Sequence, residues 1–274
     1  MTEVTFDPDR MAKVKTMARS VSQTRSYLEE LGGCRYAYFL KRVVKAWDKP
    51  AAWFPQGLAV HEAAEFWEKS NRTATLAEVE QVYKESYIKH TRRLLKGTPN
   101  PDFWYSSGPY RGQADILRRA EKGLEQIKAY VNYYTNQKPG DLVWITPDGT
   151  PAIELGFSTT FGSVTVRGYI DSIMAEILTD LKTGKKPGDI FQLSTYRFGV
   201  LDMYGIDFVK GQYYMANLKS RPTKVFDLTT MGREQVTEYY ETMDAGVKAE
   251  DFAPSPSEDK CYFCNVSSAC AYKK

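Results

Sequence analysis

Hydrophobic positions in the first half of the chain recur every three or four residues, which is the spacing of amphipathic helices. Residues 21–47 show this pattern with a break at Gly32 and Gly33, so we expect two helices or one kinked helix there. Further helices are predicted at residues 57–67, after Thr75, and at residues 116–134. The first half of the chain is therefore predicted to be all helical.

The pattern changes to a period of two after Pro139 and Gly140, as in a β-strand with one buried face. The alternating segments predict a strand meander at residues 142–145, 152–157, 163–170, 172–177 and 179–182. The remaining elements predicted are a helix at 190–201, strands at 208–216 and 224–228, and a helix at 233–243. Helices followed by strands and helices favour an α/β fold.

The composition is that of an ordinary globular protein. The chain has 274 residues, of which 42% are hydrophobic and 26% charged, and its mean hydropathy is -0.48. These values exclude collagen-like, disordered and membrane-spanning classes. Residues 1–20 lack the continuous apolar stretch of a secretory signal, so we expect a cytoplasmic protein with no membrane partner.

Basic residues concentrate in two stretches, although the formal net charge of +3 is too small to require a polyanionic partner. Residues 35–49 and 83–96 combine Lys and Arg with aromatic residues that include Trp47, Tyr83 and Tyr87. Such helices suit a nucleic-acid backbone with stacked bases. They equally suit a solvated helix face, and the sequence leaves both interpretations open.

Four cysteines are divided between the two ends of the chain: Cys34 near the start, and Cys261, Cys264 and Cys270 near the end. A Cys-x-x-Cys pair followed closely by a third cysteine favours metal ligation in a cytoplasmic protein. Four thiolates fit either a tetrahedral zinc ion or a [4Fe-4S] cluster. Such a site would join both chain ends, whereas the alternative is inert buried cysteines plus a redox pair.

Acidic and basic side chains alternate within the predicted strands. Asp180 and Lys182 are two residues apart and therefore share a face, and Asp171 lies on a neighbouring strand. The two carboxylates could bind Mg²⁺ or Mn²⁺ together with the Leu181 carbonyl, with Lys182 beside the metal-bound water. The alternative is a surface ion pair between Asp180 and Lys182.

Two further pairs have helical spacing. Gln192 and Tyr196 lie four residues apart on the next predicted helix, and His61 and Glu65 lie four apart on an earlier one. Glu154 lies on an earlier strand from which it could approach the same region. A lone histidine on such a helix would more often be a packed or surface residue.

These motifs occur in a fixed order along the chain: Gly57-Leu-Ala-Val-His61-Glu-Ala-Ala-Glu65, Gly168-Tyr-Ile-Asp171, Asp180-Leu-Lys182-Thr-Gly184 and Gln192-Leu-Ser-Thr-Tyr196. In this order the chain resembles the RecB-like branch of the PD-(D/E)xK nuclease superfamily. With its four cysteines it is similar to the Cas4-like iron-sulfur exonucleases of that branch. One departure is the absence of the expected Pro before Asp171.

The resemblance implies a restriction-endonuclease-like core, in which a mixed central sheet is flanked by helices. It divides the chain into a mainly helical lobe at residues 1–140 that carries Cys34 and His61, a nuclease core at 141–250, and a cluster-binding tail at 251–274.

The resemblance also assigns roles to the candidate residues. As metal ligands it implies His61, Asp171 and Asp180, beside the Leu181 carbonyl. As other catalytic residues it implies Lys182 together with Gln192 and Tyr196, which would contact DNA. Glu154 and Glu65 rank second. The [4Fe-4S] ligands implied are Cys34, Cys261, Cys264 and Cys270.

The function implied is metal-dependent exonuclease cleavage of DNA, preferably single-stranded, in recombination, repair or CRISPR-type DNA processing. Partners would be DNA and proteins of recombination or CRISPR adaptation. Two alternatives belong to other classes: a catalytically inactive nuclease-fold protein that binds DNA or acts as a scaffold, and a zinc-stabilised DNA-binding protein.

Overall fold

The computed structural model describes residues 5–217 and 220–274, which form two compact units. The central unit comprises Pro50–Phe157 and Tyr169–Thr230. The terminal unit comprises the chain up to Lys49, with Ser158–Gly168 and Met231–Lys274. Each unit joins separate stretches of chain, while the predicted division at residues 140 and 250 follows chain order and stays a prediction.

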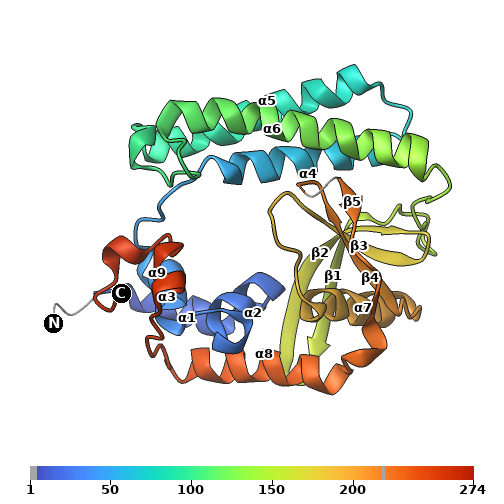
Figure 1. Cartoon of the computed structure of the whole chain (residues 1–274). Coiled ribbons are helices and arrows are strands. Elements are labelled where there is room, and N and C mark those ends of the chain that lie inside the picture. The colour runs from blue at the N-terminus through green and yellow to red at the C-terminus, as the bar shows by residue number, and fades with distance from the viewer. Residues whose placement is uncertain (1–4, 218–219) are drawn as a thin grey trace. The chain divides into compact units, whose positions relative to one another are not determined.

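Three long helices of the central unit pack together: α4 (Trp53–Lys69), α5 (Leu76–Gly97) and α6 (Gly112–Asn132) (Figure 1). The start of α5 is fixed by a capping box, in which Thr75 Oγ1 accepts from the Glu78 N–H and the Glu78 carboxylate accepts from the Thr75 N–H. The helices predicted at 57–67, after Thr75 and at 116–134 are thereby confirmed, with longer bounds.

Within the described residues the sheet has six strands: β1 (Ile153–Phe161), β2 (Val164–Met174), β3 (Ile177–Lys182), β4 (Lys210–Met215), β5 (Arg221–Pro222) and β6 (Phe226–Asp227). Their order is β1-β2-β3-β4-β5, and β6 also pairs with β4. β3 and β4 run parallel, whereas β2 with β3, and β4 with β5 and β6, run antiparallel. The predicted mixed sheet is confirmed.

Helices of the central unit cover both faces of the sheet. Neighbouring residues of a strand point to opposite faces, and Tyr214 of β4 belongs to the hydrophobic core formed with α4, α5 and α6. The adjacent Tyr213 instead donates from its hydroxyl to the Asp189 carbonyl, 2.6 Å away, at the start of α7 (Ile190–Tyr204). A Cβ at Gly199 of α7 would lie 2.7 Å from the Phe157 ring, so α7 approaches β1 closely only because a glycine stands there.

The terminal unit is mainly helical, with five α-helices among its described residues: α1 (Pro8–Thr16), α2 (Val21–Tyr27), α3 (Arg35–Phe39), α8 (Arg233–Lys248) and α9 (Glu258–Tyr262). The Arg19 side chain is buried, and its Nε donates to Asp244 Oδ1 at 2.8 Å. The backbone of Arg19 also pairs with Val166 of β2. The ion pair between Arg19 and Asp244 joins the N-terminal segment of the unit to α8.

The strand predictions were only partly correct. Residues 142–145 form isolated bridges instead of a strand. The strands predicted at 163–170 and 172–177 are one continuous strand, β2, because the polar Asp171 interrupts the apolar pattern without interrupting the backbone pairing of the sheet. The strand predicted at 224–228 is reduced to β6 and a short 3-10 turn.

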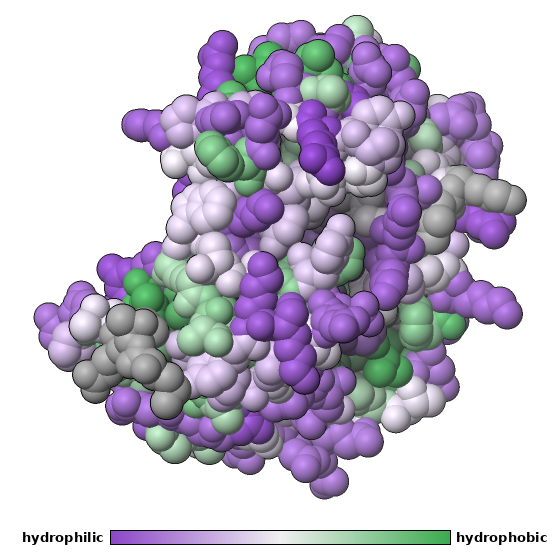
Figure 2. All heavy atoms as spheres, turned by 60° about the vertical axis from the view of Figure 1, so that its left-hand side comes forward, coloured by the Kyte–Doolittle hydropathy of each residue, from purple (hydrophilic) through white to green (hydrophobic). Residues whose placement is uncertain are grey.

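None of the described helices combines the length and the hydropathy needed to cross a membrane. On the face drawn in Figure 2, hydrophilic residues predominate and hydrophobic residues are scattered among them. This is the usual surface of a globular protein.

Candidate active site

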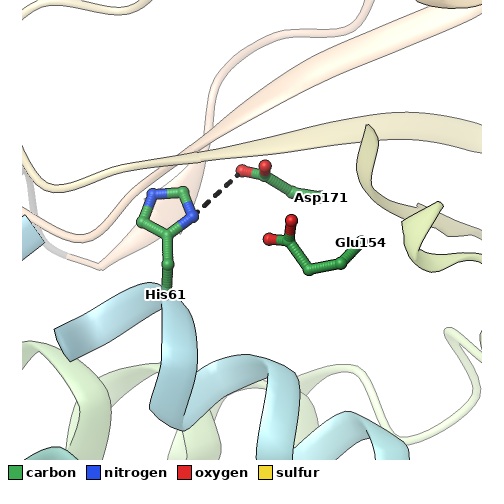
Figure 3. A group of neighbouring side chains, drawn as sticks. All are labelled: His61, Glu154 and Asp171. Carbon is green, nitrogen blue, oxygen red and sulfur yellow. Dashed lines mark ion pairs between the residues drawn. The ribbon is translucent and has the colours of Figure 1, made fainter. Parts of the chain in front are cut away.

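Three side chains of the central unit converge from different elements. His61 extends from α4, Glu154 from β1 and Asp171 from β2, and one ligand atom of each lies within 4.8 Å of the others (Figure 3). His61 Nδ1 is 3.5 Å from Asp171 Oδ2. An imidazole and two carboxylates at this spacing are a suitable donor set for a divalent cation. Glu154, placed second by its sequence, thus lies in the central trio.

The backbone at Glu154 explains why its direction was not readable from the sequence. Its φ is 48°, in the left-handed region that residues with a Cβ avoid. Such a conformation costs about 1–3 kcal/mol and concentrates at functional sites. Burial and then the charge of Asp171 raise the pKa of Glu154 to about 7, while His61 lowers it. The fold therefore holds this carboxyl against both a backbone and an electrostatic preference.

Asp171 replaces part of the backbone pairing between β2 and β3. The paired residues include Ser172 with Thr179, and beyond them the Leu181 N–H donates to Asp171 Oδ2 at 2.7 Å. Burial and then the charge of Asp180 raise the pKa of Asp171 well above its ordinary value. The candidate metal site therefore includes a side chain, Asp171, that is held by the backbone of the neighbouring strand.

Asp180 and Lys182 lie on the face of β3 covered by α7. Asp180 is 2% exposed, and its Oδ2 is 2.6 Å from Lys182 Nζ. Its Oδ1 accepts from Gln192 Nε2 at 2.5 Å and from the Tyr196 hydroxyl at 3.4 Å. Lys182 Nζ also donates to Gln192 Oε1 at 3.3 Å. The family resemblance implies that Gln192 and Tyr196 contact DNA. In the structure both form hydrogen bonds to Asp180.

The trio of His61, Glu154 and Asp171 and the pair of Asp180 and Lys182 influence each other electrostatically. Burial lowers the pKa of His61, while the charges of Asp180 and Glu154 and a hydrogen bond to the Leu181 backbone raise it, leaving a net decrease. The histidine is therefore neutral at neutral pH, as metal ligation requires. Because Asp180 shifts the pKa of both His61 and Asp171, it belongs to the same electrostatic site.

Two more acidic residues line the pocket of the trio. Glu65 pairs with Lys69 at 2.5 Å on the surface of α4. Glu68 is 4% exposed; its carboxylate accepts from Arg72 at 2.8 Å and from the Tyr130 hydroxyl at 3.0 Å. Glu68 was not predicted from the sequence, although its position seven residues after His61 places both on one face of α4.

The aromatic residues predicted in the basic stretch at 83–96 are not available for base stacking. Tyr83 and Tyr87 are 1% and 5% exposed. Their hydroxyls donate to the carbonyls of Ala120 and Ile116 in α6, at 2.8 and 2.7 Å. They join α5 to α6, and their interpretation as nucleic-acid contacts is wrong.

A family model described as the PD-(D/E)XK nuclease superfamily matches residues 20–271. The chain belongs to this superfamily. The Gene 69 protein of Mycobacterium phage D29 is 42% identical to it over 271 residues, covering 95% of this chain and 98% of the relative. The Gene 69 protein of Mycobacterium phage L5 is 37% identical over 292 residues, covering 95% and 99%. Membership of the superfamily indicates a nuclease that acts on DNA.

The metal site of this PD-(D/E)XK protein should show linked proton and metal binding. Because the pKa of Glu154 is raised from 4.5 to about 7 in the fold, its stabilising effect is fully present below pH 4.5 and is lost as the pH rises through about 7. Divalent cations favour the deprotonated carboxylates. We therefore expect Mn²⁺ to raise the melting temperature by several degrees at about pH 8 and much less at about pH 5.5.

Thermal melts with Mn²⁺ or EDTA at the two pH values test this expectation. In a His61→Ala variant the gain from Mn²⁺ should shrink at both. An equal gain in the parent protein at both pH values would contradict the assignment of Glu154 and Asp171 as ligands.

All four cysteines line one pocket of the terminal unit. Cys34 precedes α3, Cys261 lies in α9, and Cys264 and Cys270 follow it. Burial raises the pKa of Cys264, and the charges of Cys270 and Cys34 raise it further. The two ends of the superfamily domain thus contribute thiols to the same small region.

Proposed function

We propose that the protein is a metal-dependent DNA exonuclease that acts on single strands. The observation that supports this most strongly is the placement of the trio His61, Glu154 and Asp171 beside the pair Asp180 and Lys182. The imidazole and the carboxylates of the trio line one pocket, and the charges of Asp180 and Lys182 act on Asp171 from the next strand. These are the kinds of group that phosphodiester hydrolysis requires.

Each residue has a role that follows from its surroundings. His61, Glu154 and Asp171 would hold the cation, and Asp180 with the Leu181 carbonyl would complete the ligand set that the family resemblance implies. A bound Mg²⁺ or Mn²⁺ supplies an activated water and Lewis-acid stabilisation. Lys182 places a positive charge against the phosphate as negative charge develops there. Gln192 and Tyr196 orient the Asp180 carboxylate through their hydrogen bonds to it.

A preference for single strands is supported by apolar side chains beside the metal site. Phe54 and Leu58 are 41% and 50% exposed and lie on the same face of α4 as His61. Exposed apolar and aromatic groups can pack on bases that have been unstacked. In a duplex the bases are already stacked on each other, so these contacts favour a single strand.

End-labelled linear single strands, duplexes and circular single strands, each with Mg²⁺, Mn²⁺ or EDTA, test the proposal. We expect mononucleotide release from the linear single strand with either cation, and no cleavage in EDTA or of the circle. Cleavage of the circle would overturn the exonuclease assignment. DNA binding without any hydrolysis would instead identify an inactive scaffold.

We also propose that the cysteine pocket holds a [4Fe-4S] cluster with a structural role. Four thiols in one pocket fit this group in number and kind. A tetrahedral zinc ion would hold its sulfur ligands about 3.8 Å apart. Across residues 5–217 and 220–274, the ligand atoms found mutually within 4.8 Å are those of His61, Glu154 and Asp171, not the sulfurs.

A further inference from the structure

Four positively charged side chains of the central unit gather beside the end of β3. Arg118, Arg119 and Lys122 lie on α6, and Lys185 lies three residues after Lys182 in the loop that leads to α7. Asp115 is the carboxylate that pairs with the two arginines, at 2.6 Å from Arg118 and 3.6 Å from Arg119. The cluster therefore keeps a net positive charge.

A buried chain of hydrogen bonds connects this cluster to the catalytic strand. Arg119 Nη1 donates to Gln56 Oε1 at 2.9 Å, and Gln56 Nε2 donates to Gln126 Oε1 at 2.5 Å. Gln126 Nε2 then donates to the carbonyl of Thr183, the residue that follows Lys182, at 3.2 Å. Both glutamines are nearly inaccessible, at 1% and 4% exposure. The position of the cluster relative to Lys182 is thus fixed by directional bonds.

Lys122 faces the same loop. Its spacing from Arg119 and Gln126 is three and four residues, so the three share one face of α6. Burial lowers the pKa of Lys122, and the charges of Arg119, Arg118 and Lys185 lower it further, with Glu125 opposing. Among the described residues, neither Lys122 nor Lys185 forms an ion pair. The fold thus keeps these two lysines close to the two arginines without an ion-pair partner of their own in the described part of the chain, an arrangement that suits an external anion.

We propose that Lys122 and Lys185, supported by Arg118 and Arg119, form a subsite that binds a phosphate of the DNA strand next to the scissile bond. This rests on the proposed function. A ligand that reaches both this cluster and Lys182 has to carry successive phosphates, and in a nuclease the phosphodiester backbone of the substrate is such a ligand. The subsite would hold a neighbouring phosphate in place while Lys182 acts on the scissile one.

The test compares the parent with the Lys122→Gln/Lys185→Gln variant on short single strands that carry a 5′-phosphate or a 5′-hydroxyl. We expect KM for Mn²⁺-dependent cleavage and Kd for binding in Ca²⁺ to rise about tenfold, and the salt dependence of log Kd to weaken by about 1.4, or 0.7 for each lost contact. The turnover number should change less than twofold. An effect on both substrates would assign an internal phosphate, and an effect confined to the 5′-phosphate would assign the strand end.

Folding provides an independent readout. Because the two lysines repel their neighbours, their neutralisation should leave the melting temperature unchanged or raise it, which a structural role would not do. Lys84→Gln is the matched control, since Lys84 is exposed and paired with Glu80 at 3.5 Å on α5. Unchanged KM and Kd in the double variant, or an equal rise in the control, would overturn the subsite. A parent that binds DNA without cleaving it would refute the nuclease function but leave the Kd comparison valid.

Discussion

Replacement of Lys182 by methionine is expected to lower the rate of DNA cleavage by about 10³-fold or more while changing DNA affinity less than about threefold. The ammonium group lies 2.6 Å from Asp180, and its charge acts on His61 and Asp171 of the proposed metal site, where charge on the scissile phosphate would develop. Methionine keeps the length of the side chain and removes its charge. Single-turnover cleavage of a labelled single strand, together with binding in Ca²⁺, separates the two quantities.

The same substitution removes the counter-ion of a buried carboxylate. Asp180 is 2% exposed, so Lys182→Met should also lower the free energy of unfolding. The double variant Asp180→Asn/Lys182→Met restores neutrality and should recover most of that stability without recovering cleavage. Recovery of cleavage in the double variant, or normal turnover in the single one, would show that Lys182 acts only structurally.

Replacement of Cys264 by serine is expected to abolish most of the visible iron-sulfur absorbance and to lower the melting temperature by about 10 °C or more. Cys264 shares its pocket with Cys34, Cys261 and Cys270, which come from opposite ends of the chain. Loss of one ligand would therefore release the C-terminal segment from the start of α3. Iron and sulfide analysis of anaerobically purified protein measures the first effect, and thermal melts measure the second.

Ser267→Ala is the matched control, because Ser267 lines the same pocket without offering a thiol. It should retain the parent iron content. A Cys264→Ser protein with full metal content and an unchanged melting temperature would disprove the role of the pocket. A parent protein that contains one zinc ion per chain and no iron would show that the pocket is a zinc site and not an iron-sulfur site.

The sequence predicted elements well where burial follows a regular period. The long helices α4, α5 and α6 each bury one stripe of apolar side chains. The capping residues Thr75 and Glu78 mark the start of α5. The prediction divided β2 in two because Asp171 is polar, but a polar residue alone does not end a strand. Residues 142–145 alternate like a strand but form isolated bridges only.

The site was predictable only to the extent that its residues lie in ordered motifs. The spacing of Asp180 and Lys182 gives a shared face of β3, and the structure brings them together. The direction of the Glu154 side chain depends on a left-handed φ angle, and a glutamate in the sequence does not indicate such an angle. The hydrogen bonds of Gln56 and Gln126 join helices that are distant in sequence, so no local pattern reveals them.

Because the backbone at Glu154 is left-handed, stability and cation binding favour different residues at position 154. Glycine or asparagine would adopt a φ of 48° at lower cost than glutamate, and neither would bring a carboxylate close to Asp171. A library screened for heat resistance alone would thus enrich these residues at position 154 and lose the proposed metal ligand. A thermostable variant of this protein should therefore be engineered with Glu154 left unchanged.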